Sequence, residues 1–246
     1  MNILQFKTNI MIRKILITLS LLVFSGYIAA QNLQLHFDPR HALHSDAFAK
    51  NYFTATFEMF KADKWGSTFG FIDMDFNQSK GNIGMAYLEI SRDQKIGKSP
   101  IMAHVEFNGG IFRGDDQSGF SIPNAYMIGP SYATTFGKVN FSTYLVYKYN
   151  AFDKVSNDFQ WTFTYGVNLW NDKITFSGFF DLWTENKNKF KAPGESGKEV
   201  IFLTEPQFWY NVTSNLSFGS EIEISNNFVY NNKCYVNPTL AAKWNF

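Results

Sequence analysis

The chain has 246 residues, a formal net charge of +1 and only 17% charged residues, a balance that excludes a nucleic-acid binder acting through a strongly basic surface. Aromatic residues make up 18% of the chain, with 27 Phe, 12 Tyr and 6 Trp. After residue 30, however, the sequence contains no run of about 20 apolar residues that would form a transmembrane helix. Many aromatic residues without such a run are typical of a membrane β-barrel, in which apolar and polar residues alternate.

Residues 1–30 have the pattern of a secretory signal peptide. Arg13 and Lys14 precede the apolar core ILITLSLLVF, and the small-residue segment SGYIAA follows it. We expect cleavage after Ala30, which leaves residues 31–246 as the mature chain. Met11 is an alternative start, because residues 1–10 add nothing to the signal. For a β-barrel, this signal predicts export to the bacterial outer membrane.

Residues 31–246 divide into about twelve stretches in which apolar residues occupy every second position, the period of a β-strand with one apolar face. In the first half, the apolar faces begin at Leu33, Phe53, Gly70, Gly84 and Ile101. The sixth stretch, around 122–135, contains two prolines and alternates less clearly. In the second half, the faces begin at Val139, Phe159, Ile174, Val200, Leu216 and Cys234, and Ile201 and Leu203 blur the fourth of these. The apolar faces carry no charged residue, as expected where Lys or Arg at the bilayer midplane costs about 2–4 kcal/mol.

The connections alternate in length, as they do in outer-membrane barrels with short periplasmic turns and longer extracellular loops. The predicted turns are KADKWG, RDQKIGKS, GK, ND and NVTSN, and the predicted loops cover about 39–51, 77–82, 109–121, 150–157, 185–198 and 226–233. All six Trp fall near strand ends, where indole rings favour the membrane interface. We therefore predict an all-β fold, a transmembrane antiparallel up-and-down β-barrel of about 12 strands.

The last stretch alternates up to the terminal Phe246, and a closed barrel requires this strand to pair with the first. A terminal Phe preceded by alternating apolar residues resembles the signal by which outer-membrane barrels are recognised for assembly. This resemblance implies that the barrel-assembly machinery is a partner, through Phe246, in addition to the lipid bilayer.

The opposite face of each strand should point into the lumen, and it is rich in carboxylates and aromatic rings. Nine carboxylates (Glu58, Asp73, Asp75, Glu89, Glu106, Asp181, Glu205, Glu221 and Glu223) oppose three lysines (Lys148, Lys173 and Lys243). Such a field repels anions and accepts neutral or cationic solutes, and aromatic rings can stack on flat ones such as nucleosides. Alternatively, the carboxylates pair with the lysines and plug the lumen. The candidate lumen and substrate-binding residues are Glu58, Phe71, Asp73, Asp75, Tyr87, Glu89, His104, Glu106, Tyr144, Asp181, Glu221 and Glu223.

The segments TATFEMFKADKWGSTFGFIDMDF, MAYLEISRD and MAHVEFNGG resemble the Tsx-like outer-membrane proteins, which comprise twelve-stranded nucleoside-specific channels and shorter, uncharacterised relatives. The resemblance covers most of the mature chain. It implies a twelve-stranded barrel and a transport role, with nucleosides as the solute by analogy. It also implies that Phe71, Asp73 and Asp75 face the lumen.

The sequence also allows three other functions. An outer-membrane hydrolase could use His41, His44 and Asp46 in the first loop with Asp115 and Asp116 in the third, although we expect no catalysis. A porin for anionic oligosaccharides would require a basic lumen, and the excess of carboxylates argues against it. A structural or adhesion barrel would act through its loops, where the tripeptide RGD at 113–115 is too short to carry weight. No Cys and His residues have the spacing of metal ligands, so we expect neither a metal nor another cofactor.

Overall fold

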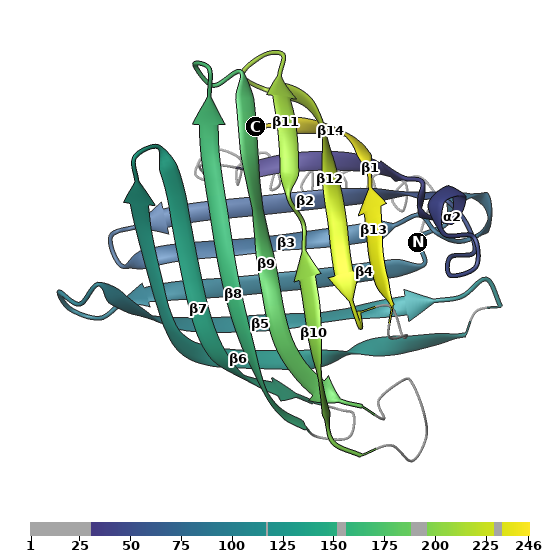
Figure 1. Ribbon diagram of the computed structural model, residues 1–246, viewed down its shortest axis with the longest axis horizontal. Coiled ribbons are helices and arrows are strands. Elements are labelled where there is room, and N and C mark those ends of the chain that lie inside the picture. Colours follow the sequence, from purple (N-terminus) through teal and green to yellow (C-terminus); the bar gives the residue numbers. More distant parts are fainter. Residues whose placement is uncertain (1–30, 117, 152–155, 188–195, 229–232) are drawn as a thin grey trace, which may run out of the picture.

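The computed structural model describes residues 31–246 except 117, 152–155, 188–195 and 229–232 (Figure 1). The predicted signal peptide lies outside the described residues and stays a prediction. The described chain forms one antiparallel sheet with two short helical turns. In chain order the elements are β1 (Gln31–Asp38), α2 (Arg40–Leu43), β2 (Tyr52–Asp63), β3 (Gly66–Asp75), η1 (Ser79–Gly81), β4 (Met85–Lys95), β5 (Ile101–Arg113), β6 (Gly119–Phe136), β7 (Val139–Asn150), β8 (Ser156–Leu169), β9 (Ile174–Asn186), β10 (Lys198–Thr204), β11 (Gln207–Asn211), β12 (Leu216–Asn226), β13 (Cys234–Pro238) and β14 (Leu240–Asn245).

The sheet closes on itself, because β1 pairs with both β2 and β14. Leu33 lies opposite Trp244, and the Phe246 amide donates to the Gln31 carbonyl over 3.0 Å. β10 and β11 pair with the same two neighbours and are interrupted at Pro206, and β13 and β14 are interrupted after Pro238. The fourteen segments therefore form a closed antiparallel barrel of twelve strands, which confirms the predicted fold.

Side chains alternate between the outer and inner faces as the sequence predicted. On β1, Leu33 and Leu35 are 44% and 48% exposed, whereas Gln34 and His36 between them are buried. The same alternation places Leu88 and Ile90 of β4, Leu145 and Tyr147 of β7 and Phe159 and Trp161 of β8 on the exposed outer face. The barrel thus presents apolar side chains outward, where they would contact lipid, and polar ones inward. With this outer face, the chain is a barrel of the bacterial outer membrane.

The sixth predicted strand exists, and its weak alternation has a structural cause. β6 carries a bulge, because Ile122 pairs with Gly110 and Ala125 with Asn108, so that β6 has one residue more than β5 in this interval. Pro123 lies in the bulge, where its missing N–H costs no ladder hydrogen bond. The predicted boundaries of the third loop, 109–121, were wrong: β5 and β6 stay paired up to Arg113 and Gly119, so the loop covers only 114–118.

The prediction that all six Trp lie at the membrane interface was partly wrong. Trp65 and Trp170 are 61% and 76% exposed in the periplasmic turns, but Trp183 and Trp209 are buried inside the barrel at 8% and 0% exposure. Trp183 lies opposite Ile201, which is also buried, so both side chains occupy the inner face. Proximity to a strand end therefore indicates the position of a Trp side chain along the barrel axis, but not whether the side chain faces outward or inward.

The first extracellular loop, 39–51, begins with α2 and folds against β13 (Figure 1). The pairing between β1 and β14 ends at Leu240. β13, which precedes β14, pairs with β12 on one side but not with β1 in the described sheet, so the other edge of β13 is left for the loop. There the His44 Nε2 atom lies 3.2 Å from the Val236 carbonyl, and the His44 and Phe48 rings both meet Tyr235 at 5.2 Å between ring centres. Within the described ranges, no helix has the length and hydropathy needed to span a membrane.

Candidate functional site

All twelve candidate residues lie on the inner face of the barrel, brought there by strands from different parts of the wall. One row of paired residues runs Glu58, Phe71, Glu89 and Asn108 across β2 to β5. The next row runs Thr56, Asp73 and Tyr87. On the β6–β9 side, Ser131, Tyr144, Thr162 and Asp181 form an equivalent row. Glu221 lies opposite Gln207, and Glu223 lies opposite Asn237.

Six of the carboxylates form a group that spans the lumen, here called the carboxylate ring: Asp73, Glu89, Glu106, Asp181, Glu205 and Glu221. They come from β3, β4, β5, β9, the β10–β11 break and β12. The charge of Glu205 acts on those of Glu221, Asp73 and Asp181, and the charge of Glu89 acts on those of Glu106 and Asp181. Because β3 and β4 are far around the sheet from β9 to β12, these interactions cross the barrel.

Most ring members are held by neutral hydrogen-bond donors. The hydroxyl of Thr56 donates to Asp73 over 2.5 Å, and that of Thr162 donates to Asp181. Glu89 Oε1 accepts from the Tyr87 hydroxyl at 2.9 Å and from the Asn108 amide at 3.0 Å. Gln207 donates to Glu221 over 2.6 Å. These bonds fix the carboxylates in place.

The lumenal lysines do not lie on the ring. The Lys148 ammonium contacts Gln160 Oε1 at 3.1 Å and the face of the Trp183 ring at 4.8 Å. The Lys243 ammonium lies 4.0 Å from the centre of the Trp209 ring. Among the described residues, the one ion pair of a ring member is that between Glu106 and His104. The lysine–carboxylate pairing that the plugged alternative requires is thus absent at the ring of the described chain.

His104 is the centre of a buried polar cluster on the β4–β6 side of the lumen. Its Nδ1 atom lies 2.8 Å from Asp93 Oδ1, its Nε2 atom lies 3.0 Å from Glu106 Oε2, and its ring stacks on Tyr144 at 3.9 Å between centres. An imidazolium can donate from both nitrogens in this arrangement. Glu106 Oε1 is buried with no hydrogen-bond partner in the described structure, which makes it an open acceptor beside the ring.

The extracellular end of the lumen holds a cation that the alternation of the strands did not indicate. Arg40 of α2 turns inward and pairs with Asp38 at 2.5 Å and with Glu223 at 3.2 Å, while its guanidinium lies over the rings of Phe48 and Tyr52. Gln34, His36 and Asp38, the inner face of β1, were also missed as lumen residues. The alternation of β1 could have identified them, but no signal in the sequence shows that a loop arginine folds inward.

The histidines and acids proposed for a rim hydrolase do not converge. His41 Nδ1 contacts the Phe48 carbonyl at 2.5 Å, and Asp46 pairs with Lys233 at 3.2 Å, which lowers the pKa of Asp46. Asp115 accepts from the Ser79 hydroxyl at 2.8 Å and from the Ser79 amide, and these bonds lower the pKa of Asp115. Each group thus serves a loop contact. In the part of the chain that the structure describes, no group of three or more His, Cys, Asp and Glu side chains could hold a metal ion.

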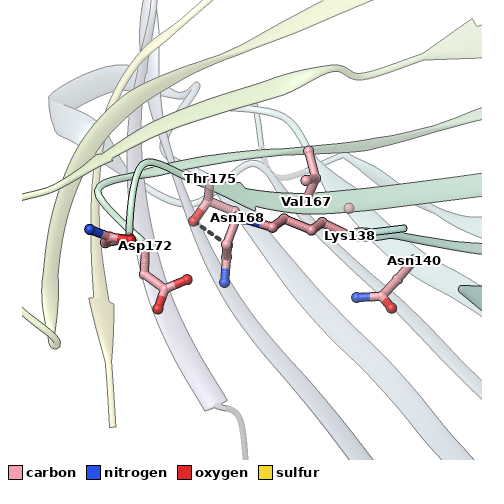
Figure 2. Close-up of a pocket in the computed structure, with 8 residues that line it drawn as sticks. Lys138, Asn140, Val167, Asn168, Asp172 and Thr175 are labelled. Carbon is pink, nitrogen blue, oxygen red and sulfur yellow. Dashed lines mark hydrogen bonds between the residues drawn. The ribbon is translucent and has the colours of Figure 1, made fainter. Parts of the chain in front are cut away.

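A pocket of about 590 Å³ lies at the periplasmic end of the lumen, and no candidate residue lines it. Figure 2 shows its polar side chains, which come from the β6–β7 turn, β7, β8, the β8–β9 turn and β9. Its polar lining consists of Lys138, Asn140, Asn168, Asn171, Asp172 and Thr175.

The model of the family described as "Domain of unknown function (DUF5020)" matches residues 30–246, so the chain belongs to this family. A search of curated proteins gives no match. Among solved structures, the NanC porin is similar with a TM-score of 0.54 at 10% identity, over 88% of this chain and 99% of that one. The KdgM porin and LpxR from Salmonella typhimurium follow with TM-scores of 0.49, at 7% and 9% identity, over 89% of this chain and 99% and 100% of theirs. The likeness to NanC shows a shared outer-membrane barrel fold.

Proposed function

We propose that this member of the DUF5020 family is an outer-membrane channel through which small neutral or cationic solutes pass passively. The carboxylate ring is the observation that carries the proposal. Six carboxylates from both sides of the barrel act on one another across the lumen, and their hydrogen-bond partners are mostly neutral. Rings of Asp and Glu are a common device for cation selectivity in pores, because they attract cations and repel anions.

Access of water to the ring supports passage rather than a purely structural role. Asp73, Glu89, Asp181, Glu205 and Glu221 are only partly buried, whereas Glu106 is buried. A solute that reaches the ring would therefore meet carboxylates in contact with water. In the described chain, Lys148 and Lys243 rest on indole rings and form no ion pair with a ring carboxylate, although the Lys148 charge still acts on Glu89 and Asp181.

We further propose that nucleosides are among the solutes that pass. This proposal rests on the aromatic side chains beside the carboxylate ring and on the resemblance to Tsx-like proteins. Phe71 packs against Tyr87 at 6.3 Å between ring centres, and Tyr87 donates to Glu89 of the ring. An aromatic face next to carboxylate acceptors can stack a flat base and accept hydrogen bonds from ribose hydroxyls. Stacking is worth about 1–3 kcal/mol per base.

The test is the single-channel current of the refolded protein in a planar bilayer while uridine, and then a neutral sugar, is added. We expect uridine to block the current in a saturable manner. Phe71→Leu should weaken this block roughly tenfold, the lower part of the range for one lost stacking contact. Phe136→Leu is the matched control, because Phe136 is 81% exposed at the periplasmic end of β6.

The outcomes test the channel role and the choice of nucleosides as the solute separately. A conducting barrel that uridine does not block would overturn nucleosides as the solute but leave the channel. A folded barrel without any conductance would overturn the channel and favour the structural or adhesion alternative.

A further inference from the structure

We infer that the pocket at the periplasmic end of the lumen is a binding site for a neutral, polyhydroxylated solute such as a sugar. The inference adds a solute site to the proposed channel. It rests on the proposed function in one respect, because the solute would reach the pocket through the lumen. The pocket has a volume of about 590 Å³ and is open to solvent, because five of its six polar lining residues are exposed.

Two asparagine amides present their nitrogen atoms to the pocket. The Thr135 hydroxyl donates to Asn140 Oδ1 over 2.8 Å, and the Thr175 hydroxyl donates to Asn168 Oδ1 over 2.9 Å. Each amide oxygen is thus engaged, and the nitrogen is the group that can donate to a solute. Figure 2 shows the side chains of Asn140, Asn168 and Asp172 pointing the same way, with the Asn168 nitrogen directed away from Thr175.

The charge of the lining favours a neutral ligand. Lys138 and Asp172 contribute one charge of each sign, so the pocket carries no formal net charge, in contrast to the carboxylate ring. In Figure 2, Lys138 extends along the wall toward Asn168, while Asp172 offers its carboxylate beside the Asn168 amide. A sugar hydroxyl both donates and accepts, so one class of solute can satisfy the amide and ammonium donors and the carboxylate acceptor together.

The turn that supplies part of the lining is held in an unfavourable backbone conformation. Trp170, Asn171 and Asp172 have φ values of 51°, 54° and 63°, in the left-handed region, which Asn and Asp tolerate but which is costly for Trp170. The Asn211 amide donates to the Asp172 carbonyl over 2.6 Å and also contacts the Thr175 hydroxyl at 3.0 Å. These bonds from β11 hold Asp172 and Thr175 at the pocket.

The test measures equilibrium binding of maltose to the folded barrel in detergent micelles by saturation-transfer NMR. The double variant Asn140→Ala, Asn168→Ala should weaken maltose binding at least tenfold. Asn82→Ala is the matched control, because Asn82 is exposed in the extracellular loop after η1. Heat-modifiable mobility in gels verifies that each variant is folded, and the single variant Asn168→Ala serves if the double variant does not fold.

Saturable maltose binding that Asn82→Ala leaves unchanged and the pocket variants weaken would support the inference. Binding that the pocket variants do not weaken, no saturable binding, or tighter binding of glucuronate or glycine than of maltose would overturn it. Because the measurement needs no current, a barrel that binds maltose but does not conduct would contradict the proposed channel and not this site.

Discussion

Trp209 shows how single residues organise the lumen. Its side chain is fully buried, its Nε1 atom donates to Gln207 Oε1 over 2.9 Å, and its ring contacts His36 edge-on at 6.0 Å between centres. Gln207 in turn donates to Glu221 of the carboxylate ring. Trp209 thus provides a face for the Lys243 ammonium and a fixed partner for the residue that orients Glu221.

Trp209→Ala should destabilise the barrel by about 3–5 kcal/mol, because it leaves a large cavity in the packed interior. Urea unfolding in micelles, followed by tryptophan fluorescence, measures the change in the free energy of unfolding. Trp170→Ala is the control and should cost about 1 kcal/mol or less, since Trp170 is exposed in a turn. Equal losses in the two variants would show that Trp209 has no special part in the packing.

At the scale of elements, close approach of neighbouring strands decides where side chains fit. Gly219 of β12 lies under Trp209, and a Cβ atom there would meet the Phe208 carbonyl oxygen at 2.1 Å and Trp209 Cε3 at 2.7 Å. Gly166 of β8 is also on the inner face, but a Cβ atom there would meet only Ser177 Cβ, at the ordinary distance of 3.9 Å.

Gly219→Ala should therefore destabilise the barrel by about 1–3 kcal/mol through overpacking, and Gly166→Ala should leave stability nearly unchanged. The same urea titration compares the two variants. An unchanged free energy of unfolding in Gly219→Ala would mean that β11 and β12 can move apart without cost.

The sequence predicted the strands and their faces well, because alternation is a local property of each strand. It could not predict which inward carboxylates meet, since that depends on the stagger of twelve strands around a closed sheet. Glu205 and Asp73 are far apart in the chain, and their charges act on one another only because the sheet closes. The inward turn of Arg40, the inward face of Trp183 and the periplasmic pocket likewise depend on loop packing and pairing between strands.

At the scale of the whole molecule, the barrel combines an apolar outer face with an interior whose charges are unevenly placed. Arg40 with Asp38 and Glu223 occupies the extracellular end, the carboxylate ring lies between, and a pocket without net charge lies at the periplasmic end. A cation entering from outside would pass a paired arginine and then a group of carboxylates. This order predicts a preference of the pore for cations over anions.

The most direct measurement is the reversal potential of the protein in a planar bilayer across a KCl gradient. We predict a cation-selective potential, and Asp73→Asn with Glu221→Gln should lower the K⁺ to Cl⁻ permeability ratio by about half or more, because two of the six ring carboxylates are lost. Asp116→Asn, in the third extracellular loop, should leave the ratio unchanged. Anion selectivity, or a ratio that the ring variant does not alter, would contradict a channel governed by the carboxylate ring.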